Sequence, residues 1–343
     1  MKKIFIIFCV IVSTITSVSS FALEADQYKL WERSEDLKDA TEAVNTTINN
    51  LLTEYYVKRV KNKKVACEVV AARFLRYVRP NFFKDRLKSS LSDNPNVQLY
   101  PEKSNLFKDY PQSIYRGFTW PFIMPVAQSI KIDNVYLGTD KIDHFFSSGR
   151  RYYREYQRAL KKGASHIEAL IQALDYGSSF IEEKGILGYW SSGAFAFADI
   201  EANYNGMTLA IDMCQGTNPI LKKNADATLS INRNIEMRDY VNPLWDEAFN
   251  NSFYFNYRWY GIRRIMLQKY CDLGKTKKIQ NLWKSYQKNI KPSFHTDYLR
   301  GLILAGTIPD PRPQSLHEVC NYPDGMMEQV PFWNLKNNEG KRN

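Results

Sequence analysis

Side chains that could carry chemistry concentrate between positions 138 and 206 of this 343-residue chain. They stand in pairs or at helical spacing, inside an otherwise apolar pattern: Asp140, His144, Glu182, Glu183, Asp199 and Asn203. Residues four positions apart, such as Asp140 and His144, share one face of a helix. Burying such groups is costly unless they pair, bind a metal or take part in a reaction. We therefore expect any active site to include members of this set.

Three chemistries fit the set if helices bring it together. A carboxylate pair can cleave a glycosidic bond, with Glu183 or Glu182 as the acid and Asp199 as the second carboxylate. Mixed imidazole and carboxylate ligands can bind Zn²⁺ or Mn²⁺, so a divalent metal is an alternative, although no cofactor is required. Its ligands would be Asp140, His144, Glu183 and Asp199. The third reading is a satisfied buried network, supported by Asp140, His144 and Asn203, that fixes how helices pack.

Three helices are expected to position these side chains, over residues 141–162, 166–183 and 197–214. Between the last two lies a segment rich in glycine and aromatic residues, which predicts a loop or a short β-hairpin near 185–197. A helix ending in a glutamate and followed by such a turn has an architectural similarity to lysozyme-like glycosidases. By that analogy, Tyr189 and Trp190 would stack on a sugar ring. Ser192 and Arg151 are further substrate-binding candidates.

Both ends of this region carry a recognisable pattern. It opens with Asp140-Lys141-x-x-His144-Phe145 and closes with Asp199-Ile-x-Ala-Asn203-x-x-Gly206. Over residues of about 138–210, the pattern resembles the YfiM family of periplasmic lipoproteins and, more distantly, VanZ-like proteins. The resemblance implies an envelope location more firmly than it implies a reaction. It marks ten positions: Asp140, Lys141, His144, Phe145, Glu183, Ser192, Gly193, Asp199, Asn203 and Gly206.

The chain begins with features of a secretory signal. Lys2 and Lys3 precede an apolar run, and a small-x-small cleavage site ends at Ala22. Residues 1–22 are therefore expected to be removed, and the protein to be periplasmic or secreted. The remaining 45 basic and 36 acidic residues leave a charge of +9, since the signal holds two of the 47 basic residues and no acid. Such a charge favours anionic partners, and export argues against nucleic acid.

The remaining cysteines are Cys67, Cys214, Cys271 and Cys320. Their spacing excludes a CxxC zinc site, and it allows up to two disulfides in three pairings or buried free thiols. The sequence contains no G-x-S-x-G, P-loop, HExxH or GxGxxG motif, which removes support for serine hydrolase, nucleotide hydrolase, zincin and dinucleotide-binding functions.

Outside this region the pattern also predicts a mainly α fold with long irregular loops. A stripe from Leu37 to Tyr55 and a segment over 65–78 indicate helices, as do 276–289 and 296–305. We expect one compact domain with three regions: an N-terminal helical region (23–130), the polar module (131–216) and a C-terminal helical region (217–343).

These observations predict an exported envelope protein, with hydrolysis of peptidoglycan or another glycan as the leading hypothesis. The rival is a non-catalytic protein that binds an envelope or membrane surface. The basic, tyrosine-rich helix from Arg150 to Lys162 could contact anionic glycan or lipid head groups. Ordinary packing of arginine stems over a tyrosine-rich core explains the same helix.

Overall fold

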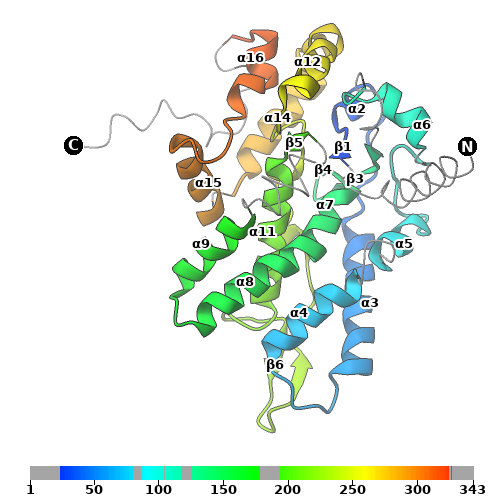
Figure 1. Ribbon diagram of the computed structural model, residues 1–343. Coiled ribbons are helices and arrows are strands. Elements are labelled where there is room, and N and C mark those ends of the chain that lie inside the picture. The colour runs from blue at the N-terminus through cyan, green and yellow to red at the C-terminus, as the bar shows by residue number, and fades with distance from the viewer. Residues whose placement is uncertain are drawn as a thin grey trace, which may run out of the picture.

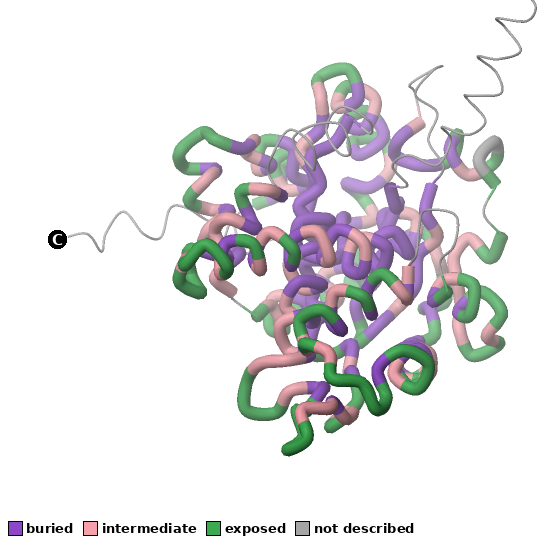
Figure 2. Tube along the Cα trace, turned by 60° about the horizontal axis from the view of Figure 1, so that its bottom comes forward, coloured by how far each residue is buried: buried purple, intermediate pink, exposed green. Residues whose placement is uncertain are grey.

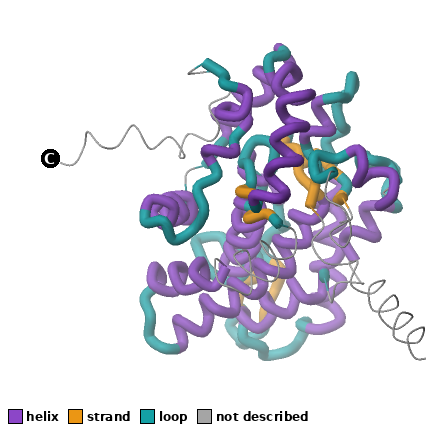
Figure 3. Tube along the Cα trace, turned by 45° about the horizontal axis from the view of Figure 1, so that its top comes forward, coloured by secondary structure: helices purple, strands orange, loops and turns teal. Residues whose placement is uncertain are grey.

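The computed structural model describes residues 24–79, 86–103, 105–116, 126–177, 193–291, 293–323 and 326. Helices dominate this part of the chain, and its strands occur in four two-stranded pairs (Figures 1 and 3). The fold is mainly α, as the sequence predicts. Within these described residues, no helix has both the length and the apolar character needed to cross a bilayer.

The longer helices are α3 (Thr41–Arg59), α4 (Cys67–Val78), α8 (Gly149–Lys161), α9 (His166–Gly177), α11 (Phe197–Asp212), α12 (Asn256–Ile265), α14 (Lys277–Asn289) and α15 (Phe294–Leu304). The shorter ones are α2 (Tyr28–Trp31), α5 (Arg86–Ser92), α6 (Leu106–Asp109), α7 (Thr139–Asp143), α13 (Cys271–Gly274) and α16 (Leu316–Cys320). The helix predicted over 141–162 is thus α7 and α8, joined by a π-helical turn at His144–Ser148.

The strands pair in ways that the sequence pattern shows only in part. A hairpin joins β3 (Ser129–Ile132) to β4 (Val135–Gly138) through Asp133 and Asn134, both at positive φ as a tight hairpin turn requires. Of the loop or short hairpin predicted near 185–197, residues 185–192 lie outside the described residues. The described end contains β5 (Ala194–Phe195), which pairs with the distant β8 (Phe253–Tyr254). The other pairs are β1 (Glu24–Ala25) with β2 (Val126–Ala127), and β6 (Leu221–Lys223) with β7 (Leu229–Ile231).

Helix α11 lies at the centre of the molecule, and burial is concentrated around it (Figures 1 and 2). It packs against α8, the π-helical turn and α4. Gly206 allows the closest of these approaches, because a Cβ at that position would lie 1.8 Å from the carbonyl oxygen of Phe145. The small residues of α11 therefore let the helices of the polar module touch backbone to backbone, as expected from the sequence.

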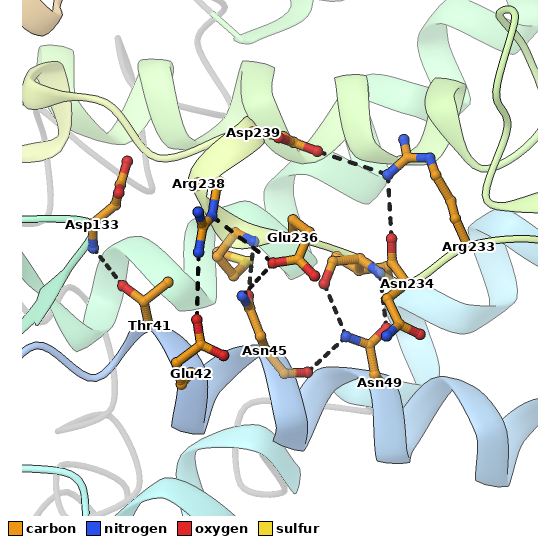
Figure 4. A network of polar contacts seen from close by, with 12 residues as sticks. Thr41, Glu42, Asn45, Asn49, Asp133, Arg233, Asn234, Glu236, Arg238 and Asp239 are labelled. Atoms are coloured by element: carbon orange, nitrogen blue, oxygen red, sulfur yellow. Dashed lines mark hydrogen bonds and ion pairs between the residues drawn. The ribbon is translucent and has the colours of Figure 1, made fainter.

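Polar side chains on α3 fix the position of the segment 233–239 (Figure 4). Asn45 donates to Glu236 at 2.6 Å and accepts from the backbone of Met237 at 2.8 Å. Asn49 exchanges two hydrogen bonds with the backbone of Ile235, at 2.8 and 2.9 Å. These amides satisfy the backbone of an irregular segment, which is the usual solution where a loop packs against a helix.

Two disulfides connect regions that are distant in sequence. Cys67 at the start of α4 pairs with Cys214 just beyond α11, and Cys271 in α13 pairs with Cys320 in α16. The pairing that the sequence left open is thereby resolved. Structural disulfides are compatible with an oxidising compartment.

Candidate functional site: a buried lysine among carboxylates

Lys141 is the centre of the polar module. Its side chain is 0% exposed, and its ammonium lies 2.5 Å from a carboxylate oxygen of Asp140 and 2.5 Å from one of Asp199. It also pairs with Glu247. The side chains of the three carboxylates are themselves 3 to 6% exposed, so this ion cluster is closed to solvent.

Two helix starts and one loop deliver these groups. Asp140 stands in the first turn of α7 and Asp199 in the first turn of α11. Carboxylates are favoured in the first turn of a helix, where free backbone N–H groups and the helix dipole are positive. Glu247 follows the 3₁₀ turn Pro243–Trp245 and also accepts a hydrogen bond from the Tyr115 hydroxyl at 3.1 Å.

The carboxylates determine the protonation of the cluster. Burial alone would lower the pKa of Lys141, but Asp140, Asp199, Glu247 and Glu24 together raise it well above its ordinary value. Burial raises the pKa of Glu247 well above its ordinary value, and the three other carboxylates add to this against the opposing effect of Lys141. These carboxylates therefore hold the lysine in its charged form.

His144 connects this cluster to the surface. Its Nε2 lies 3.3 Å from the second carboxylate oxygen of Asp199, and its Nδ1 lies 3.1 Å from Oδ1 of Asn203. Asn203 in turn donates to the hydroxyl of Tyr152 at 3.4 Å. The His144 side chain is 25% exposed, yet both ring nitrogens already face oxygen atoms. Within this arrangement the imidazole has no nitrogen left for a metal or a substrate.

The arrangement also bears on the metal alternative. Lys141 lies between Asp140 and Asp199, which is where an ion bound by both would have to lie. Among the described residues, one group of carboxylates has the close spacing of a cation site, with oxygens within 4.8 Å of one another: Glu24, Asp140 and Glu247. Two members of that group, Asp140 and Glu247, already pair with the ammonium of Lys141.

A second buried pair lies further along α11. Glu201 accepts from His295 of α15 at 2.7 Å and from Asn242 at 2.8 Å. The Tyr204 ring stacks on His295 with centroids 4.7 Å apart. Burial opposes the charge on Glu201, but His295 and the two amides that bond it hold its pKa below the ordinary value. This pair attaches α15 to α11.

The structure brings together four of the predicted site residues: Asp140, His144, Asp199 and Asn203. Arg151 lies on α8 and is half-buried. The other predicted residues lie outside the described residues, so their catalytic and substrate-binding roles stay predictions: Glu182, Glu183, Tyr189, Trp190 and Ser192.

Glu247 is the member of the cluster that sequence reasoning missed. It stands 106 positions from Lys141, so no local spacing relates the two. The structure buries both Asp246 and Glu247, directly after the 3₁₀ turn Pro243–Trp245. The available signal was an acidic pair directly after Trp245, inside an aromatic segment, because buried acids are rare unless they are paired.

Comparison with known proteins gives no assignment. No family model, curated protein or solved structure matches this chain. The interpretation of the site therefore depends on its geometry.

Proposed function

We propose that this protein is an exported, non-catalytic component of the cell envelope that binds an anionic surface, and that its polar module is a structural unit. The observation that carries the proposal is the enclosure of Lys141. A buried ammonium paired with three carboxylates is costly to assemble, and buried polar clusters of this kind can contribute to a unique packing arrangement. Such a cluster holds the starts of two helices and one loop in a fixed relation.

The position of Asp199 favours this proposal over hydrolysis. A nucleophile or general base must come within hydrogen-bonding reach of the substrate. The two carboxylate oxygens of Asp199 instead face Lys141 and His144, and its side chain is 6% exposed. The glycan-hydrolase hypothesis then depends on Glu182 and Glu183 alone.

Three sequence features support export and an anionic partner. They are the signal-like segment 1–22, the resemblance of both ends of the polar module to envelope proteins, and the net charge of +9 after cleavage. The two disulfides are compatible with this location.

The proposal is tested with purified mature protein and envelope fragments. We expect the protein to sediment with the fragments, to be released by salt because the attraction is electrostatic, and to leave the turbidity of a peptidoglycan suspension unchanged. The double variant Glu182→Gln/Glu183→Gln should bind equally well. Clearing of peptidoglycan by the wild type, abolished in that variant, would instead establish the hydrolase.

A further inference from the structure

Helices α4 and α8 present basic side chains to one another across a surface groove. On α8, Arg150, Arg154 and Arg158 follow at steps of four, and Lys161 continues the row. On α4, Arg73 and Arg76 occupy the facing side. The sequence interpretation found the α8 row but not the α4 arginines, because contact between the two helices is a tertiary feature.

The groove has a volume of about 620 Å³. Its basic lining consists of Arg73, Arg154, Arg158 and Lys161, which we call the arginine groove. The apolar part of its lining includes Val69, whose side chain stays 38% exposed. A groove of this size, with an apolar base and charged walls, is within the range of protein ligand sites.

Acidic residues neutralise only part of this positive charge. Glu68 is the acid that lines the groove, and Glu155 pairs with Arg158. Within the described part of the chain, Arg73, Arg76, Arg150 and Arg154 have no ion-pair partner. Burial lowers the pKa of Arg150, and repulsion from Arg154, Arg76 and Arg151 lowers it further. The protein thus holds several guanidinium groups close together without compensation.

We infer that the arginine groove binds the phosphate groups of an anionic lipid layer. This inference deepens the proposed function, on which it rests, by naming the surface and the partner chemistry. A guanidinium presents a planar fork of N–H donors that matches phosphate oxygens, and several forks in one groove favour phosphate over a single carboxylate. The exposed apolar base suits the region just beneath lipid head groups, where basic and apolar side chains act together.

Vesicle sedimentation tests the inference directly. We expect the full mature protein to bind phosphatidylcholine vesicles only when they contain phosphatidylglycerol, and to bind less as salt increases. The triple variant Arg73→Gln/Arg154→Gln/Lys161→Gln, all three from the lining of the groove, should bind about 100-fold more weakly, because each cation near an anionic surface contributes a several-fold factor. All three side chains are exposed, so the fold should survive, which circular dichroism checks.

A charge-matched variant provides the control. Lys277→Gln/Lys284→Gln/Lys288→Gln removes the same charge from exposed positions of α14, well away from α4 in Figure 1. It should keep most of the affinity. If the triple variant is unstable, Arg154→Gln alone should still lose about fivefold.

Three outcomes would overturn the inference: equal losses in the two triple variants, vesicle binding that ignores phosphatidylglycerol, or retention of an acidic polysaccharide in place of vesicles. The proposed function fails separately. If the triple variant of the arginine groove still sediments with envelope fragments, the protein binds the envelope through another surface. If the wild type binds neither vesicles nor fragments, both proposals are refuted.

Discussion

Lys141 holds an ammonium where three carboxylates would otherwise repel one another. Asp140 and Asp199 each place an oxygen 2.5 Å from that ammonium, and Glu247 also pairs with it. The buried ammonium is stabilised by several carboxylates at once. Removal of the lysine would therefore leave buried carboxylates without a counter-ion. The cluster is therefore far more sensitive to removal of one member than an exposed ion pair.

Lys141→Met tests this sensitivity. The change keeps most of the side-chain volume and removes the charge, so the buried carboxylates lose their counter-ion. We expect the free energy of unfolding to fall by about 3–5 kcal/mol, measured by urea denaturation. The exposed Lys277→Met on α14 should change it by less than about 0.5 kcal/mol. A loss below about 1 kcal/mol for Lys141→Met would show that the cluster is not a stabilising unit.

Asp246 predicts an unusual pH dependence. Burial raises its pKa to about 7, although the backbone of Ala248 and the Tyr286 hydroxyl oppose the shift. Between pH of about 4 and 7, the unfolded chain has released this proton while the folded protein retains it. Stability from this group is therefore complete below its unfolded pKa and is lost as the pH rises through the folded value.

We expect the free energy of unfolding to fall from pH 5 to pH 8, with Asp246 contributing about 3 kcal/mol at most over this range. Urea denaturation over that range measures the slope. Asp246→Asn, which resembles the protonated acid, should flatten the dependence of the unfolding free energy on pH. Asp272→Asn, at an exposed position, should leave that dependence unchanged. An unchanged slope in Asp246→Asn would mean that Asp246 is ionised in the folded protein.

Helices were the predictable part of this fold, because their contacts with the core recur every three or four residues. The stripe from Leu37 to Tyr55 is buried throughout, although α3 begins only at Thr41. The β3–β4 hairpin escaped notice because its strands are four residues long. In the site, the sequence could predict that Asp140 and Asp199 belong together, because both stand near helix starts. It could not predict Glu247, since only the folded chain brings its loop to Lys141.

Gly206 is the position where the close approach of two helices depends most directly on residue type. An alanine there would place its Cβ 1.8 Å from the Phe145 carbonyl oxygen, and a backbone atom cannot rotate away. Gly206→Ala should therefore destabilise the protein by at least about 3 kcal/mol, the upper part of the range for overpacking, measured by urea denaturation. Gly301→Ala on α15 is the matched control: its Cβ would meet nothing within 4 Å, so better helix propensity should stabilise by up to about 1 kcal/mol. Equal effects of the two changes would contradict this account.

The molecule combines an apolar interior, which contains two buried ion clusters, with a basic net charge. One continuous cluster of buried apolar side chains extends from Tyr28 to Tyr322. Helix α11 contributes Asp199 to one of the two buried ion clusters and Glu201 to the other. The arginine groove lies on the α4–α8 side of the molecule. A rigid interior supports surface binding, because arginines held by well-packed helices lose little freedom when they bind.

The two disulfides connect distant parts of the chain. The different lengths of the loops that they close predict unequal contributions to the free energy of unfolding. Cys67–Cys214 closes a loop with a sequence separation of 147, against 49 for Cys271–Cys320. In the chain-entropy model, the longer loop restricts the unfolded state more, by about 1 kcal/mol. Urea denaturation of Cys67→Ser/Cys214→Ser and Cys271→Ser/Cys320→Ser measures the difference, with reduced wild type as the reference for losing both. We expect the first pair to cost more, because it also fixes α4 beside the end of α11. A larger loss from the second pair would mean that the contacts of α13 with α16, rather than loop closure, determine the contribution of the disulfide.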